Sequence, residues 1–113
     1  MKYGLKDEYI EKFIAIIEKF DCVEKIVLFG SRAMGNYKKA SDVDIALFGE
    51  NVNWGIACSI KYKVEDETTI PYFFDSVAYN TIKNDALKEH INTEGVVLWK
   101  KIWKKNYVGN KDL

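Results

Sequence analysis

Apolar residues near the start of the chain recur every three or four positions, which is the spacing of one face of an α-helix. They are Leu5, Tyr9, Phe13, Ile16, Ile17 and Phe20. This pattern predicts an amphipathic helix over residues 6–20. A continuous apolar run, Ile26-Val27-Leu28-Phe29, follows and ends at Gly30. Because the run is rich in β-formers and does not alternate with polar residues, it predicts a strand covered on both faces.

Two more strands are predicted further along. Residues 31–35 can form a short helix and Gly35-Asn36-Tyr37 a turn, after which a second strand spans roughly 42–48. The only proline, Pro71, introduces an aromatic, β-prone segment over residues 72–79, which predicts a third strand with Asp75 in its middle.

Helical patterns occupy the remaining segments. Asn53 can cap a helix that carries Ile56, Ile60 and Val64 and ends near residues 65–67. Asn84 or Asp85 can begin another, with Leu87 and Ile91 inward, Gly95 at the position after the helix, and a short strand over residues 96–99. We therefore expect an α/β fold, with a small mixed sheet of about four strands flanked by helices. Residues 1–99 form one domain and residues 100–113 a basic C-terminal tail.

Composition narrows the class of protein. Hydrophobic residues make up 48% and charged residues 30% of the 113 residues, which is typical of a globular domain. Seventeen basic side chains balance seventeen acidic ones, so no global positive field favours direct nucleic-acid binding. No run approaches the ~20 apolar residues of a membrane span, and the N-terminal segment has no signal-peptide pattern. Cys22 and Cys58 are interpreted as buried thiols in a reducing compartment, and a cytoplasmic location is expected.

The candidate chemistry lies between residues 25 and 48. Successive side chains on a strand point to opposite faces, so Asp42 and Asp44 project from one face, about 7 Å apart. Two carboxylates aimed at one point favour a hard cation such as Mg²⁺. Ser31 lies where a short helix would begin, and helix N-termini collect phosphate. Asp75 is the candidate for a third acid, although the sequence leaves open whether it shares the face of Asp42 and Asp44.

Two rival motifs fail at specific residues. Gly30 and Gly35 have the glycine spacing of a P-loop, but Asn36-Tyr37 replaces the Lys-Ser/Thr pair that a P-loop needs. An EF-hand loop would need an acid or amide at position 46 and glycine at 47, where the chain has Ala46 and Leu47.

At Gly30-Ser31, then ten residues, then Asp42-Val43-Asp44, with Asp75 in a later strand, the sequence resembles the DNA polymerase β-type nucleotidyltransferases. More narrowly, it resembles the minimal nucleotidyltransferases. The resemblance covers most of residues 25–99; it extends to Arg32, Gly35-Asn36-Tyr37, Ser41, Pro71-Tyr72-Phe73-Phe74 and the segment from Leu87 to Ile91.

The resemblance implies a polymerase β-like fold and transfer of a nucleoside monophosphate, with AMP from ATP as the leading case, to a hydroxyl group. It implies that Asp42 and Asp44 ligate two Mg²⁺ ions, and that Asp75 ligates one and draws the proton from the acceptor. The nucleotide would be bound by Gly30, Ser31, Arg32 and Ser41, with Ser31 on the terminal phosphates.

Members of the minimal branch are often antitoxins whose partner is a small all-helical HEPN ribonuclease. In that family the toxin is itself the acceptor, so the resemblance implies that the partner receives the nucleotide. The length of this chain, which the nucleotide-binding core occupies, agrees with this. Two alternatives stay open: an antitoxin that acts by binding alone, and a small-molecule nucleotidyltransferase with a separate acceptor-binding subunit. A homo-oligomer or a hetero-oligomer is compatible with either.

Several other residues are weaker candidates. Arg32 is either a triphosphate ligand or a solvated surface charge. His90, in a predicted helix at a solvent-side spacing, is expected to be exposed and is assigned no chemistry. In the tail, Trp99 is expected to pack on the core, and Trp103 and Tyr107, among lysines, to contact a partner.

Overall fold

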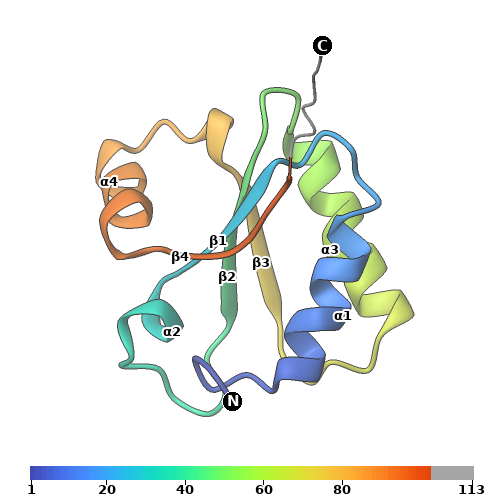
Figure 1. Ribbon diagram of the computed structural model, residues 1–113. Helices are drawn as coiled ribbons and strands as arrows, with labels where there is room; N and C mark the ends of the chain where they lie inside the picture. Colours follow the sequence, from blue (N-terminus) through green and yellow to red (C-terminus); the bar gives the residue numbers. More distant parts are fainter. Residues whose placement is uncertain (103–113) are drawn as a thin grey trace.

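Strands and helices alternate along residues 1–102, which the computed structural model describes (Figure 1). The elements are α1 (Asp7–Ile17), β1 (Lys25–Phe29), α2 (Ser31–Met34), β2 (Val43–Phe48), α3 (Trp54–Glu67), β3 (Phe74–Ala78), a short 3₁₀ helix η1 (Tyr79–Thr81), α4 (Asp85–Glu94) and β4 (Val96–Lys100). The predicted order of elements is confirmed. The predicted contacts of Trp103 and Tyr107 lie outside the described residues.

The strands form one mixed sheet in the order β3-β2-β1-β4. β1 pairs antiparallel with both β2 and β4, whereas β2 and β3 are parallel and are connected through α3. A parallel pair needs such a crossover because the chain must return to the end of the sheet from which it started. The predicted small mixed α/β sheet is confirmed.

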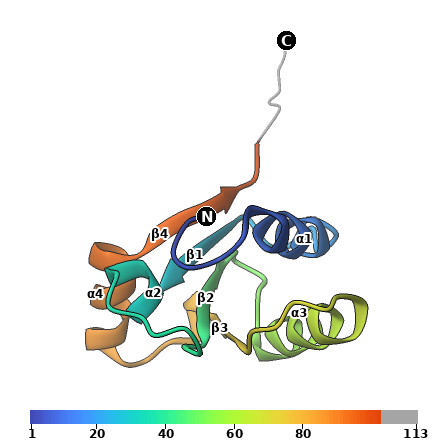
Figure 2. The ribbon, with the colours of Figure 1, turned by 90° about the horizontal axis from the view of Figure 1, so that it is seen from below.

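Helices cover both faces of the sheet (Figure 2). On one face, α1 and α3 pack on a cluster that includes Ile26, Leu28, Ile45 and Leu47. On the other face, Ile91 of α4 packs on Val27, Phe29 and Ala46. Neighbouring residues of β1 therefore enter opposite cores, and the strand predicted to be covered on both faces is confirmed.

Both predicted asparagine caps are present. The side chain of Asn53 accepts a hydrogen bond from Ile56 N at 2.9 Å, and that of Asn84 accepts one from Leu87 N at 3.1 Å. Each cap satisfies a backbone N–H that has no partner within its helix. Trp99 is half-buried and packs against the main core, as predicted.

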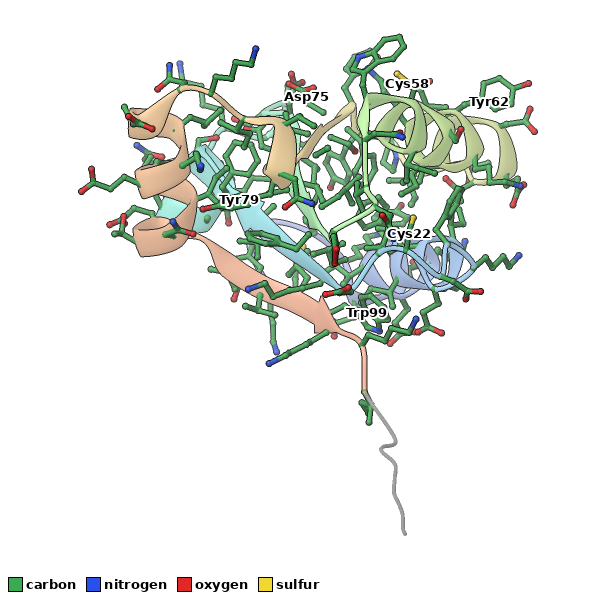
Figure 3. The ribbon with its side chains drawn as sticks, turned by 90° about the horizontal axis from the view of Figure 1, so that it is seen from above. Cys22, Cys58, Tyr62, Asp75, Tyr79 and Trp99 are labelled. Carbon is green, nitrogen blue, oxygen red and sulfur yellow. The ribbon has the colours of Figure 1, made fainter. Side chains whose placement is uncertain are left out.

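Some boundaries and burials differ from the predictions. The first helix ends at Ile17 because Phe20 N bonds to Ile17 O in a tighter turn. Cys22 is half-buried and Cys58 is exposed on the outer side of α3 (Figure 3), so the prediction that both thiols are buried is wrong. Among residues 1–102, no helix is long and apolar enough to span a bilayer.

Candidate active site

Three segments bring the predicted site residues to one end of the sheet. β1 ends there, at Gly30 and Ser31, while β2 and β3, being parallel to each other, both begin there. Asp44 is paired directly with Asp75 across β2 and β3. Since side chains two apart on a strand share a face, the question that the sequence left open is answered: Asp75 lies on the face of Asp42 and Asp44.

This face is the one that α4 covers only in part. Asp44 is two residues from Ala46, and Asp75 two residues from Val77, both of which belong to the α4-side cluster. Asp44 is half-buried, whereas Asp42 and Asp75 are exposed, and Figure 3 shows Asp75 projecting outward from the sheet. The three carboxylates therefore form an open acidic surface on the sheet.

The electrostatics of Asp44 reflect its two acidic neighbours. Burial raises the pKa of Asp44 above its ordinary value, and the charges of Asp75 and Asp42 raise it further, while His90 acts in the opposite direction. Like charges gathered in a partly desolvated place oppose ionisation. The site therefore carries an unfavourable negative potential that a cation would relieve.

Gly30 begins the turn that faces these carboxylates. Its backbone has φ 77° and ψ −156°, a conformation open essentially only to glycine. A Cβ atom on Gly30 would overlap the side chain of Asp44. Glycine is therefore needed here for both backbone conformation and space, and Ser31, half-buried, follows directly at the start of α2.

Arg32 is buried, so of its two predicted roles the solvated surface charge is wrong. Its side chain is only 1% exposed. Its guanidinium donates to the carbonyl oxygens of Tyr3, Lys39 and Ser41 at 2.9–3.3 Å. In this arrangement, the guanidinium has no exposed side for a phosphate.

Aromatic faces complete the surroundings of Arg32. Its guanidinium carbon lies 5.1 Å from the ring centroid of Tyr37 and 4.8 Å from that of Tyr72. Arg32 thus joins the N-terminal segment to the chain just before Asp42 and to the chain just before β3. It holds together the segments from which the carboxylates project.

Ser41, predicted to bind nucleotide, also serves the local backbone. Its hydroxyl oxygen accepts a hydrogen bond from Lys38 N at 2.8 Å, and its carbonyl oxygen accepts the bonds from Arg32. Ser41 therefore closes the turn that delivers Asp42 to the sheet.

His90 is the residue that the sequence reasoning missed. It is half-buried, and its Nε2 accepts a hydrogen bond from Gly30 N at 3.0 Å. The prediction that His90 is exposed is wrong, because α4 is rotated to bring both Ile91 and His90 toward β1. The spacing of Leu87 and Ile91 predicted the inner face of α4. It could not indicate the contact of His90 with Gly30, which lies 60 residues earlier in the chain.

The donor set suits a hard divalent cation. Mg²⁺ prefers carboxylate oxygens and takes its remaining ligands from water and substrate phosphates. Among residues 1–102, no three His, Cys, Asp or Glu side chains are already gathered around one point. The carboxylates of Asp42, Asp44 and Asp75 have the oxygen chemistry that such a cation prefers.

The family model for polymerase β nucleotidyltransferases matches residues 11–102 of this chain. The match spans the sheet, the Gly30-Ser31 turn and all three carboxylates. The chain therefore belongs to the polymerase β nucleotidyltransferase family. A comparison with curated proteins gave no significant match.

Solved toxin–antitoxin structures contain chains of the same fold. A toxin–antitoxin complex with AMP-PNP aligns with a TM-score of 0.67 at 22% identity, covering 86% of this chain and 75% of that one. The MntA-HepT toxin–antitoxin aligns at 0.65 and 19% identity, covering 85% and 74%. The tri-AMPylated Shewanella oneidensis HEPN toxin in complex with the MNT antitoxin aligns at 0.64 and 19% identity, covering 86% and 74%. At these identities, the comparisons establish the shared fold.

Proposed function

We propose that the chain is a Mg²⁺-dependent nucleotidyltransferase that transfers AMP from ATP to a hydroxyl group of a HEPN-type partner protein, as that partner's antitoxin. The observation that carries the proposal is the direct pairing of Asp44 with Asp75. It puts a third carboxylate on the face of Asp42 and Asp44, beside the turn at Gly30 and Ser31. A family that acts on nucleoside triphosphates needs this combination of an acidic face and a close backbone turn.

Each residue has a role in the proposal. Asp42 and Asp44 ligate two Mg²⁺ ions, and Asp75 ligates one of them. Ser31 binds the terminal phosphates, and Gly30 lets the backbone pass close to them. Arg32 and Ser41 act on the nucleotide indirectly, by fixing the backbone before Asp42. When bound, the metal would neutralise charge on the triphosphate and favour a deprotonated acceptor.

The proposed reaction is an in-line displacement at the α-phosphorus. The acceptor oxygen forms a bond to this phosphorus, the bond to the β-phosphate oxygen breaks, and pyrophosphate leaves with the bonding electrons. Asp75 takes the proton of the acceptor hydroxyl. Asp75 is exposed near the start of β3, which suits this role because the acceptor must approach from solvent.

The partner is proposed from the fold comparisons together with the open site. Chains of this fold occur in structures of a toxin–antitoxin with AMP-PNP and of an AMPylated HEPN toxin with its MNT antitoxin. Asp42 and Asp75 are exposed, so a protein hydroxyl could reach them. We propose that the partner is small and all-helical, that the two chains form a hetero-oligomer, and that they act in the cytoplasm.

The test is to incubate the chain with MgATP and the product of the neighbouring gene, and then to weigh that product. We expect the partner to gain the mass of one or more AMP groups. In Asp44→Asn, the rate should fall on the order of a hundredfold or more, because a charged ligand at the reacting phosphate is lost.

Matched controls separate the alternatives. Asp66→Asn removes an equal charge from an exposed position of α3 and should leave transfer intact. Neutralisation of the partner that survives Asp44→Asn, with no added mass in either case, would favour an antitoxin that acts by binding alone. Consumption of ATP without a change in the mass of the partner would favour a small-molecule acceptor.

A further inference from the structure

His90 contacts the turn at Gly30 from a position 60 residues further along the chain. It lies on α4, and its Nε2 accepts the hydrogen bond of Gly30 N at 3.0 Å. In this bond Nε2 is the acceptor and the Gly30 N–H is the donor. The bond therefore links the helix that covers the sheet to the first residue of the turn.

The position of His90 is fixed by the core rather than by the turn. The next residue, Ile91, is 2% exposed and packs with Val27, Phe29 and Ala46. The His90 ring also meets the Phe29 ring edge to face, with 6.0 Å between centroids. The imidazole is thus held by its neighbours in an orientation that directs Nε2 at Gly30.

Gly30 needs such support because its conformation is uncommon. Its φ of 77° and ψ of −156° lie in a sparsely populated region, and such conformations persist where the surrounding contacts determine them. His90 holds the Gly30 N–H, and Met34 N donates to the Gly30 carbonyl at 3.1 Å. Both polar groups of Gly30 are therefore fixed, and with them the direction in which the chain enters Ser31.

We infer that His90 is a positioning residue for nucleotide binding: through Gly30, it holds the Ser31 turn in the orientation that receives the phosphates of a nucleoside triphosphate. The inference rests on the proposed function. His90 occupies the Gly30 N–H itself, so the phosphates are received by groups further along the turn.

The test compares two uncharged replacements that differ in where they place an acceptor. In His90→Gln, the side-chain oxygen can occupy the place of Nε2, whereas in His90→Asn the shorter side chain cannot reach Gly30. Thr93→Asn puts the same residue at an exposed position of α4 and controls for helix propensity. The readouts are the Kd for MgATP, the melting temperature without nucleotide, and KM and kcat for transfer.

We expect His90→Asn to raise the Kd and KM for MgATP about tenfold, as for the loss of one orienting hydrogen bond. At saturating nucleotide its kcat should be unchanged. His90→Gln should restore binding to within about threefold of wild type, and Thr93→Asn should match wild type. In wild-type protein, ¹⁵N NMR should show scalar coupling between Gly30 N and His90 Nε2.

Three results would overturn the inference. One is binding of MgATP by His90→Asn as tight as by wild type. The second is equal weakening in the Gln and Asn variants, which would mean that the imidazole acts through packing alone. The third is absence of the NMR coupling. Failure of the wild-type chain to bind MgATP is a separate outcome, which would overturn the proposed function and, with it, this role of His90.

Discussion

Asp44 is the site carboxylate whose ionised form the fold disfavours. Its pKa is raised above the ordinary value of 3.8 by burial and by the charges of Asp75 and Asp42. The folded chain therefore holds the proton more tightly than the unfolded chain does. This contribution to stability is complete below pH 3.8 and is lost as the pH rises through the folded-state pKa.

Asp44→Asn should therefore make the metal-free protein more stable at about pH 7, with the gain disappearing at about pH 3. The reason is that the variant removes the ionised carboxylate, which is unfavourable only at the higher pH. Urea unfolding at the two pH values measures this. Asp66→Asn, the same change on exposed α3, should show no such gain. A large loss of stability in Asp44→Asn would mean instead that Asp44 has a structural role.

For Arg32, in contrast to Asp44, we expect substitution to lower stability, because its guanidinium stabilises the fold. Arg32→Lys should lower the free energy of unfolding by about 2 kcal/mol or more, since one ammonium group cannot serve the carbonyls of Tyr3, Lys39 and Ser41 together. Urea unfolding is the measurement. If Arg32→Lys kept full stability but weakened MgATP binding, Arg32 would be a phosphate ligand after all.

At the scale of elements, the turn between β1 and α2 can be tested with two glycines of positive φ. Gly30→Ala should lower stability by about 2 kcal/mol or more and abolish MgATP binding, because its Cβ would collide with Asp44. Gly35 has φ 85° and nothing within 4 Å of an added Cβ. Gly35→Ala should cost only about 1 kcal/mol and keep nucleotide binding.

These two variants separate strain from function, since both place alanine at a positive φ. The free energy of unfolding and the Kd for MgATP are measured for each. If Gly35→Ala impaired binding as much as Gly30→Ala, the effect would come from strain in α2 as a whole and not from the approach of Gly30 to Asp44.

The sequence predicted the elements well where one local pattern determines them. β1 could be recognised because Ile26-Val27-Leu28-Phe29 enters two cores, and α3 because Asn53 caps it. Gly95 shows the limit. It follows α4 as predicted, but with φ −69° rather than a left-handed conformation. Glycine is needed there because a Cβ would collide with the Ile91 carbonyl and Val27, a contact that the local sequence does not encode.

The carboxylates show the same limit at the site. The common face of Asp42 and Asp44 follows from strand geometry alone. The face of Asp75 depends on the register of β2 with β3, which is set after α3 returns the chain to the sheet. The contact of His90 with Gly30 and the burial of Arg32 likewise join segments that are distant in sequence. Tertiary packing, rather than any local pattern, determines all three.

For the whole molecule, the surface formed by Asp42, Asp44 and Asp75 leads us to expect that thermal stability depends on bound MgATP. MgATP should raise the melting temperature, because a ligand that binds only the folded state at 100 times its Kd adds about 2.7 kcal/mol, which is on the order of 10 °C for a domain of this size. Asp42→Asn should abolish the shift while leaving the metal-free protein at least as stable. The reason is that Asp42 is exposed and its negative charge repels that of Asp44. Thermal unfolding with and without MgATP is the measurement, with Asp66→Asn as the charge-matched control. A full shift in Asp42→Asn would place the metal elsewhere, because a ligand of the metal cannot be neutralised without weakening the bound state.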